Sequence, residues 1–224
     1  GRLLRGRTGS PSRAGLAATI AAGAGGCAGL VDDLHLMIAP IVLGRGARLW
    51  DDLPDRERTH KVTLTVSEVP LEVAPGLWQT RWTFNGGSVG PTLHGRVGDV
   101  FEVTLVNDGS MGHSIDFHAS RSSPDTTMRT ISPGRSLDVE FTIDHAGIWL
   151  YHCSTMPMSA HIAAGMFGAL IVAPADLPTV DRQYVLVQSE TYLAEQNNQP
   201  VDTGKIADEK VDLTMFNGHA NQYL

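Results

Sequence analysis

Residues 151–166, YHCSTMPMSAHIAAGM, decide how the rest of the sequence is interpreted. The stretch begins at the end of an apolar segment typical of a β-strand, in which neighbouring side chains point to opposite faces. His152 and Cys153 are therefore expected to face opposite sides of one strand. Cys153 is followed by His161 and then by Met166. A thiolate, an imidazole and a thioether in this order form a soft ligand set that suits copper.

A second histidine-rich segment, GHSIDFH at 112–118, lies upstream. His113 and His118 are separated by an odd number of positions, which on an extended strand places them on opposite faces. The two segments then combine into two ligand sets. The set expected to hold type 1 copper is His113, Cys153, His161 and Met166. The set expected to hold type 2 copper is His118 and His152, with a position left open for substrate.

The peptide between His152 and Cys153 would join the two copper ions and give an electron a short covalent route. A single histidine or methionine in a sequence is more often structural than a ligand, and zinc is the main rival metal for cysteine and histidine sets. The combined spacing, with one thiolate and a trailing methionine, favours copper. His145 is expected at the surface. Met156 and Met158 are rival candidates for the axial ligand, but they are expected to pack within the ligand loop.

From His60 onward the pattern is that of a β protein. Short segments rich in β-branched and aromatic residues alternate with Gly, Pro, Asn and Asp turn signals. Strands are expected at 61–68, 78–84, 99–106, 136–142, 148–151, 169–172 and 183–188. Strands of this length and spacing predict a mainly β fold, an antiparallel sandwich or barrel with Greek-key connections.

An internal echo suggests a repeated unit. The segment WTFNG at 82–86 returns as TMFNG at 214–218. A repeat of this period indicates two tandem copies of one β domain. We therefore expect a first domain at 60–175, followed at 176–224 by a linker and the start of a second domain.

Composition narrows the classes of function. The 224 residues carry a net charge of −7, which argues against a nucleic-acid partner held by phosphate contacts. The sequence has no apolar run of transmembrane length, so no transmembrane span is expected. Its two cysteines exclude a disulfide framework. The chain begins with Gly, and we interpret it as a fragment at both ends.

Residues 60–224 resemble the first cupredoxin domain of copper-containing nitrite reductases, within the multicopper oxidase superfamily. The resemblance rests on WTFNG at 82–86, GPTL at 90–93, Gly98-Asp99, HSIDFH at 113–118, MRTISPG at 128–134, YHC at 151–153 and GMFGA at 165–169. It implies a cupredoxin fold, the copper roles given above, and one-electron reduction of nitrite to nitric oxide.

The resemblance also implies a catalytic role for Asp116, which would hydrogen-bond the bound ligand and relay a proton. Asp116 could instead orient one of the neighbouring histidines. In the family, the type 2 copper has a third histidine ligand, which comes from the second domain of a neighbouring subunit in a homotrimer. A further catalytic histidine also lies in the second domain. Both would lie outside these residues. The electron donor would be a small cupredoxin or cytochrome c, and the location periplasmic or otherwise extracytoplasmic.

Two other functions stay open. A laccase-like multicopper oxidase reduces O2 at a trinuclear cluster, which needs His-x-His pairs and a His-Cys-His motif, whereas Ser154 follows Cys153 here. A non-catalytic electron carrier would need only the type 1 set. The sequence departs from the family at Val89, where proline is usual, and the loop from Cys153 to His161 is one residue shorter than in well-known members.

The N-terminal residues 1–57 have a different character. Residues 29–53 resemble the C-terminal piece of the dihydrofolate-reductase-like domain of riboflavin-biosynthesis reductases, which implies a short α/β fragment. Alternatively, the basic start and the small residues before Cys27 imitate an export leader, so the export signal is ambiguous.

Overall fold

The computed structural model describes residues 21–22, 38–40, 59–176 and 183–221. The reductase-like fragment expected at 29–53 and the candidate leader before Cys27 lie almost wholly outside the described residues. The residues described in this region form two short strands, β1 (Ala21–Ala22) and β2 (Ile38–Pro40). The expectation for residues 1–57 therefore stays a prediction.

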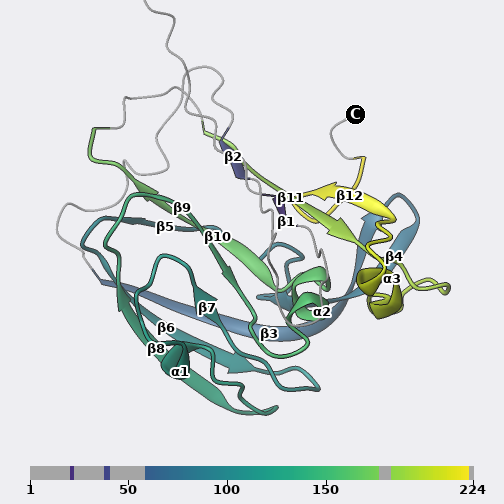
Figure 1. Ribbon diagram of the computed structural model, residues 1–224, viewed down its shortest axis with the longest axis horizontal. Coiled ribbons are helices and arrows are strands. Elements are labelled where there is room, and N and C mark those ends of the chain that lie inside the picture. Colours follow the sequence, from purple (N-terminus) through teal and green to yellow (C-terminus); the bar gives the residue numbers. More distant parts are fainter. Residues whose placement is uncertain (1–20, 23–37, 41–58, 177–182, 222–224) are drawn as a thin grey trace, which may run out of the picture.

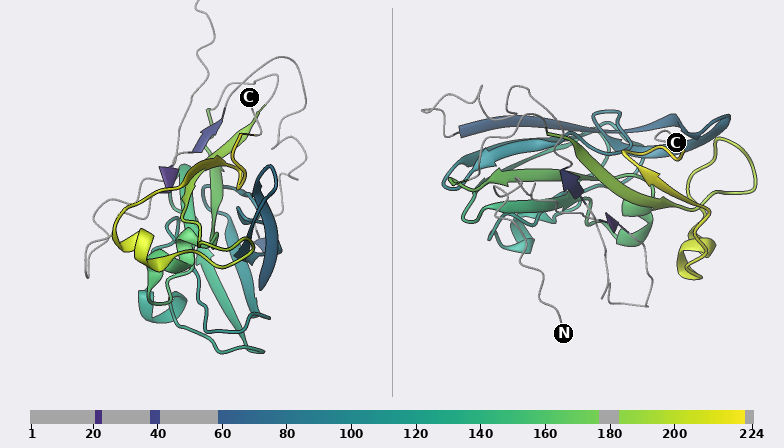
Figure 2. Two further views of the ribbon diagram at one scale, coloured as in Figure 1. Left: turned by 90° about the vertical axis from the view of Figure 1, so that its right-hand side faces the viewer. Right: turned by 90° about the horizontal axis from the view of Figure 1, so that it is seen from above.

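Two four-stranded sheets form the body of the molecule (Figure 1). In strand order, the first contains β4 (Leu77–Phe84), β3 (Thr59–Ala74), β6 (Val100–Asn107) and β8 (Ser136–Thr142). The second contains β5 (Leu93–Arg96), β10 (Phe167–Ala173), β9 (Gly147–His152) and β7 (Asp116–Phe117). In Figure 1 the two sheets lie one above the other as layers, and the right-hand view of Figure 2 looks down on them. The predicted mainly β sandwich is confirmed.

The core lies between the sheets, and strands of the first sheet alternate buried side chains with solvent-facing ones, whereas β10 of the second sheet is buried over nearly its whole length. Phe101, Val103 and Leu105 of β6 are buried, and the residues between them are partly exposed. The same alternation along β8 buries Leu137 and Val139. Removing these apolar side chains from water is the main force that holds the two sheets together.

The strand pairing is mixed, so the expectation of a wholly antiparallel sandwich is wrong. β3 pairs with β6 in parallel, and β5 pairs with β10 in parallel. After β4 the chain crosses to the second sheet as β5 and returns as β6, which makes β6 run in the same direction as β3. Alternation marks each strand in the sequence but carries no information on its direction.

The two Phe-Asn-Gly segments adopt the same structure. Asn85, at φ 56°, donates its main-chain N–H to the Thr65 carbonyl, and its side-chain oxygen accepts the Thr65 N–H at 2.6 Å. Asn217, at φ 50°, makes the equivalent pair of hydrogen bonds with Val187. The second turn follows β12 (Leu213–Phe216), which pairs with β11 (Val185–Thr191). This likeness supports the tandem repeat; the domain boundaries stay a prediction.

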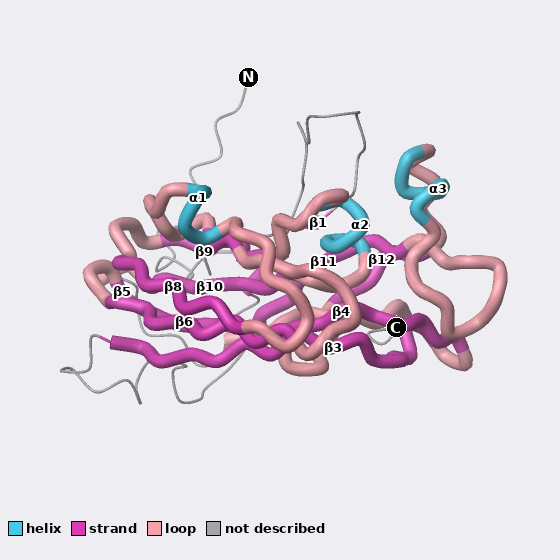
Figure 3. The backbone as a smooth tube through the Cα atoms, turned by 90° about the horizontal axis from the view of Figure 1, so that it is seen from below, coloured by secondary structure: helices cyan, strands magenta, loops and turns pink. Residues whose placement is uncertain are grey.

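From residue 59 onward, the structure adds three short helices and the strands β5, β7 and β12, which the sequence pattern did not reveal. The helices are α1 (Pro124–Thr127), α2 (Met158–Ala163) and α3 (Thr203–Ala207). They lie on one side of the sandwich, opposite β3 (Figure 3). Elements of one or two turns are too short to produce a helical period. Among the described residues, no helix has the length and apolar character needed to cross a membrane.

We predict that Asn85→Ala lowers the free energy of unfolding by about 2 kcal/mol, because it removes two side-chain hydrogen bonds to β3 and places an alanine at positive φ. Asn85→Gly keeps the backbone freedom and loses only the hydrogen bonds, so it should fall between the wild type and the alanine variant. Urea unfolding of the three proteins tests this order. Equal stabilities would contradict it.

Candidate metal centres

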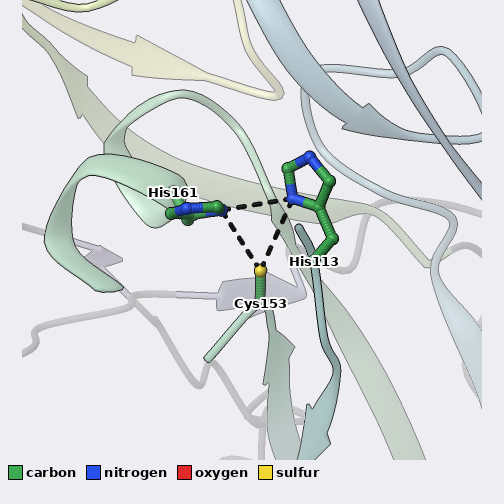
Figure 4. A group of neighbouring side chains, drawn as sticks. All are labelled: His113, Cys153 and His161. Atoms are coloured by element: carbon green, nitrogen blue, oxygen red, sulfur yellow. Dashed lines mark hydrogen bonds between the residues drawn. The ribbon is translucent and has the colours of Figure 1, made fainter. Parts of the chain in front are cut away.

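Three potential ligands meet at the edge of the main core. The Sγ of Cys153 lies 3.3 Å from Nδ1 of His161 and 3.8 Å from Nδ1 of His113. The two Nδ1 atoms are 3.2 Å apart, and all three side chains are buried (Figure 4). Three donor atoms that converge at these distances fit a metal with a thiolate and two imidazole ligands.

The loop after β9 positions this cluster. Cys153 follows the last residue of β9 and donates its main-chain N–H to the Met166 carbonyl at 3.0 Å. Met166 in turn donates its N–H to the carbonyl of His161, which lies on α2. Met166 is fully buried in the same hydrophobic cluster as Cys153. The loop therefore folds back so that the expected fourth ligand shares main-chain contacts with two of the others.

Hydroxyl groups fix the surroundings of the sulfur. The Ser114 N–H donates to Cys153 Sγ at 3.5 Å. The Ser114 hydroxyl accepts hydrogen bonds from the Ser154 N–H at 3.1 Å and from the Thr155 hydroxyl at 3.0 Å. These contacts tie the segment around His113 to the loop after Cys153, and an N–H aimed at the sulfur stabilises negative charge on it.

Burial keeps the imidazoles of this cluster uncharged. Desolvation lowers the pKa of His113 to about 4, opposed in part by the negative charge of Glu68. The pKa of His161 is also lowered to about 4, by desolvation and then by the charge of the neighbouring His113. Neutral imidazoles are the form that binds a metal ion, so the fold prepares both rings as ligands.

A second cluster combines two imidazoles and a carboxylate. Nε2 of His118 lies 3.0 Å from Nε2 of His152 and 3.8 Å from Oδ2 of Asp116. The Nδ1–H of His152 donates to the Cys153 carbonyl at 3.0 Å, which leaves the lone pair of the imidazole on Nε2, facing His118. The His118 side chain is 44% exposed, so this cluster is open to solvent on one side.

The two clusters lie on opposite sides of the main chain at the end of β9, where His152 is the last residue of the strand and Cys153 follows it. Tyr151 and Cys153 belong to the main core, whereas Leu150 packs in a different cluster. His152 stands opposite Asp116 in the β7–β9 pair. Adjacent residues at the end of β9 therefore supply one donor to each cluster.

His113 and His118 do not lie on one extended strand, so that expectation is wrong. The segment from His113 to His118 is not a continuous strand; only Asp116–Phe117 forms β7, and His113 makes an isolated bridge with Ile131. The parity of an extended strand therefore does not apply between them. The two histidines do reach different clusters, but this follows from the irregular backbone between His113 and β7 and not from alternation along one strand.

Other residues singled out in the sequence lie apart from both clusters. His145 is exposed and contacts Arg121 at 3.2 Å, as expected for a surface residue. Met158 packs against a hydrophobic cluster, whereas Met156 is 78% exposed and does not fill the loop as expected. Sequence reasoning missed the indole of Trp82, which lies beside both His113 and His161. No sequence signal near Trp82 indicates this contact.

Comparison with known proteins identifies the family. Residues 65–176 match the family model described as multicopper oxidase. The chain belongs to the multicopper oxidase family. A copper-containing nitrite reductase of Neisseria gonorrhoeae is 33% identical over 175 residues, covering 74% of this chain and 45% of that protein. The structure of a copper nitrite reductase from Nitrosomonas europaea superposes with a TM-score of 0.67 at 39% identity, covering 72% of this chain and 57% of that one.

Membership of this family gives the chain the cupredoxin fold and indicates copper as its cofactor. Both clusters suit that cofactor: the thiolate and two imidazoles fit an ion that cycles between Cu(I) and Cu(II), and the two facing imidazoles fit an ion with an open position. The chain spans less than half the length of the Neisseria relative.

We predict that the metal-free chain loses stability as the pH falls from about 6.5 to about 4. In this window the histidines of the unfolded chain take up protons, whereas His113 and His161, with pKa values of about 4, do not. The unfolded state therefore binds more protons, and the free energy of unfolding decreases with falling pH. Urea unfolding at several pH values measures the slope.

The double variant His113→Gln/His161→Gln is the control and should show a shallower slope. A residual slope should remain, because burial also lowers the pKa values of His94 and His152. A wild-type stability that is constant across this pH window would contradict the prediction.

Proposed function

We propose that the protein containing this chain reduces nitrite to nitric oxide by one-electron chemistry. In this proposal the type 1 copper ligands are His113, Cys153, His161 and Met166. The type 2 copper ligands from this chain are His118 and His152. The observation that carries the proposal is the pair of donor clusters joined through one peptide bond, that between His152 and Cys153.

The two clusters differ in their exposure to solvent, which suits them to different tasks. Cys153 and its partners are buried, which suits a centre that exchanges electrons and binds no substrate. His118 is 44% exposed, which suits a centre that a small anion can reach. The His152–Cys153 main chain is a covalent path for an electron between them, reinforced by the hydrogen bond from His152 Nδ1–H to the Cys153 carbonyl.

The reaction consumes two protons and one electron for each nitrite and yields nitric oxide and water. Copper, when bound, supplies the electron and a Lewis acid that orients the anion. Asp116 is placed to hold and deliver a proton, because its carboxylate lies 3.8 Å from Nε2 of His118 and its side chain is 25% exposed. The remaining imidazole of this site would come from outside the chain.

The partners follow from the same proposal. Nitrite is the substrate, and a small cupredoxin or cytochrome c is the electron donor. The proposed assembly is a homotrimer, in which a neighbouring subunit completes the type 2 site. The proposed location is an extracytoplasmic compartment. The relatives named copper-containing nitrite reductase support nitrite as the substrate.

An O2-reducing oxidase is the second candidate, because a structure described as a multicopper oxidase superposes with a TM-score of 0.61 at 28% identity. The two functions differ in what they consume. Copper-loaded protein that consumes O2 but not nitrite, with an artificial electron donor, would favour the oxidase. Protein that accepts and passes on electrons but consumes neither would favour an electron carrier.

We predict that His118→Ala lowers nitrite turnover by more than about 100-fold and removes one copper per chain, because a ligand is lost from the open site. The visible absorption of the copper–thiolate bond should stay unchanged, since Cys153 and its partners are untouched. His145→Ala, a change at an exposed histidine outside both clusters, is the control. Metal analysis, absorption and a nitrite assay provide the readouts. Unchanged turnover in His118→Ala would reject the proposal.

For Asp116→Asn we expect both coppers to be retained and nitrite turnover to fall by about 100-fold or more, because the amide cannot deliver a proton. If Asp116 only orients His118, the amide should still do so and turnover should change little. The comparison of copper content with turnover separates these two roles.

A further inference from the structure

Trp82 lies against both histidines of the buried cluster. Its ring centre is 4.8 Å from that of His161, at an interplanar angle of 66°. It is 6.0 Å from that of His113, at 73°. The two imidazoles are themselves 5.0 Å apart at 74°. The three rings therefore meet edge to face, and neither imidazole can swing toward the indole without a clash.

The main chain of Trp82 holds the same loop. Its N–H donates to the Ala164 carbonyl at 3.1 Å, just after the end of α2. Its carbonyl oxygen approaches Gly165 so closely that a Cβ there would lie 3.1 Å away, and Gly165 has φ +118°. β4 is thus attached to the segment between His161 and Met166 by both a side chain and a main chain.

The indole also separates the cluster from its surroundings. Trp82 packs against the main core that contains Cys153 and against a second cluster that includes Tyr192 and Val201. It therefore fills the space between β4, α2 and the segment that follows β11. An apolar side chain at this place keeps water away from the imidazoles on that side.

We propose that Trp82 is a positioning residue of the type 1 centre, which fixes both imidazole rings and excludes water from them. The inference rests on the proposed ligand set but not on nitrite as the substrate. An apolar, dry surrounding disfavours Cu(II) relative to the less charged Cu(I), so Trp82 raises the reduction potential of the centre. Rings held at fixed angles also slow the release of the metal.

The experiment compares copper-loaded wild type with Trp82→Ala, Trp82→Leu and Trp82→Phe. The readouts are the midpoint potential, the absorption and electron paramagnetic resonance spectra of the copper–thiolate centre, and the rate of copper loss to a Cu(I) chelator. Trp82→Ala should lower the potential and speed copper loss about tenfold or more. Trp82→Phe should stay close to wild type, and Trp82→Leu should fall between them if both the ring and the apolar volume contribute.

Trp149→Ala is the matched control, because Trp149 is also half-buried against the main core but contacts neither histidine in the described contacts. It should destabilise the fold without shifting the potential. Unchanged potential and copper loss in Trp82→Ala, or equal shifts in Trp149→Ala, would overturn the inference. If Trp82→Ala fails to fold, Trp82→Leu and Trp82→Phe decide by the same comparison.

The outcomes distinguish this inference from the proposed function. Shifts confined to the Trp82 variants, in a protein that does not turn over nitrite, would support the positioning role and reject nitrite as the substrate. A wild type without a copper–thiolate absorption band would reject the ligand set, and this inference with it.

Discussion

The arrangement of this molecule depends on one stereochemical constraint, the alternation of side chains along a β-strand. At the end of β9 it turns His152 toward Asp116 and His118, and Cys153 toward the core and the rings of His113 and His161. Two clusters of different chemistry are thereby built a single peptide bond apart. An extra residue between them would place both side chains on one face and lengthen the covalent path.

Burial then gives the clusters different characters. The sulfur cluster is buried, so its imidazoles stay neutral over a wide pH range and its thiol lies in apolar surroundings. The second cluster is partly exposed and includes a carboxylate, so solvent and small anions have access to it. The cost of burying neutral donors is modest compared with that of burying charges, which makes such a site compatible with a stable core.

The loop from Cys153 to Met166 shows how local and long-range contacts cooperate. α2 brings His161 back over the sulfur, and hydrogen bonds between Cys153, His161 and Met166 close the loop on itself. Contacts from distant strands complete it: Ser114 orients the sulfur, and Trp82 packs on the imidazoles. Part of the rigidity of the site therefore comes from segments that lie 39 to 79 residues before His161 and Cys153 in the sequence.

The sequence by itself determined most of the strands, through their alternation, and the candidate donor residues, through spacings that place a thiolate, an imidazole and a thioether within one loop. It also showed the repeated Phe-Asn-Gly turn, because such a turn needs residues that tolerate positive φ. Only the tertiary structure decided the parallel pairing of β3 with β6, the irregular backbone between His113 and β7, and the contacts of Ser114 and Trp82. These features arise where segments far apart in the chain meet, and the residue types involved are common to many other environments, so no local pattern specifies them.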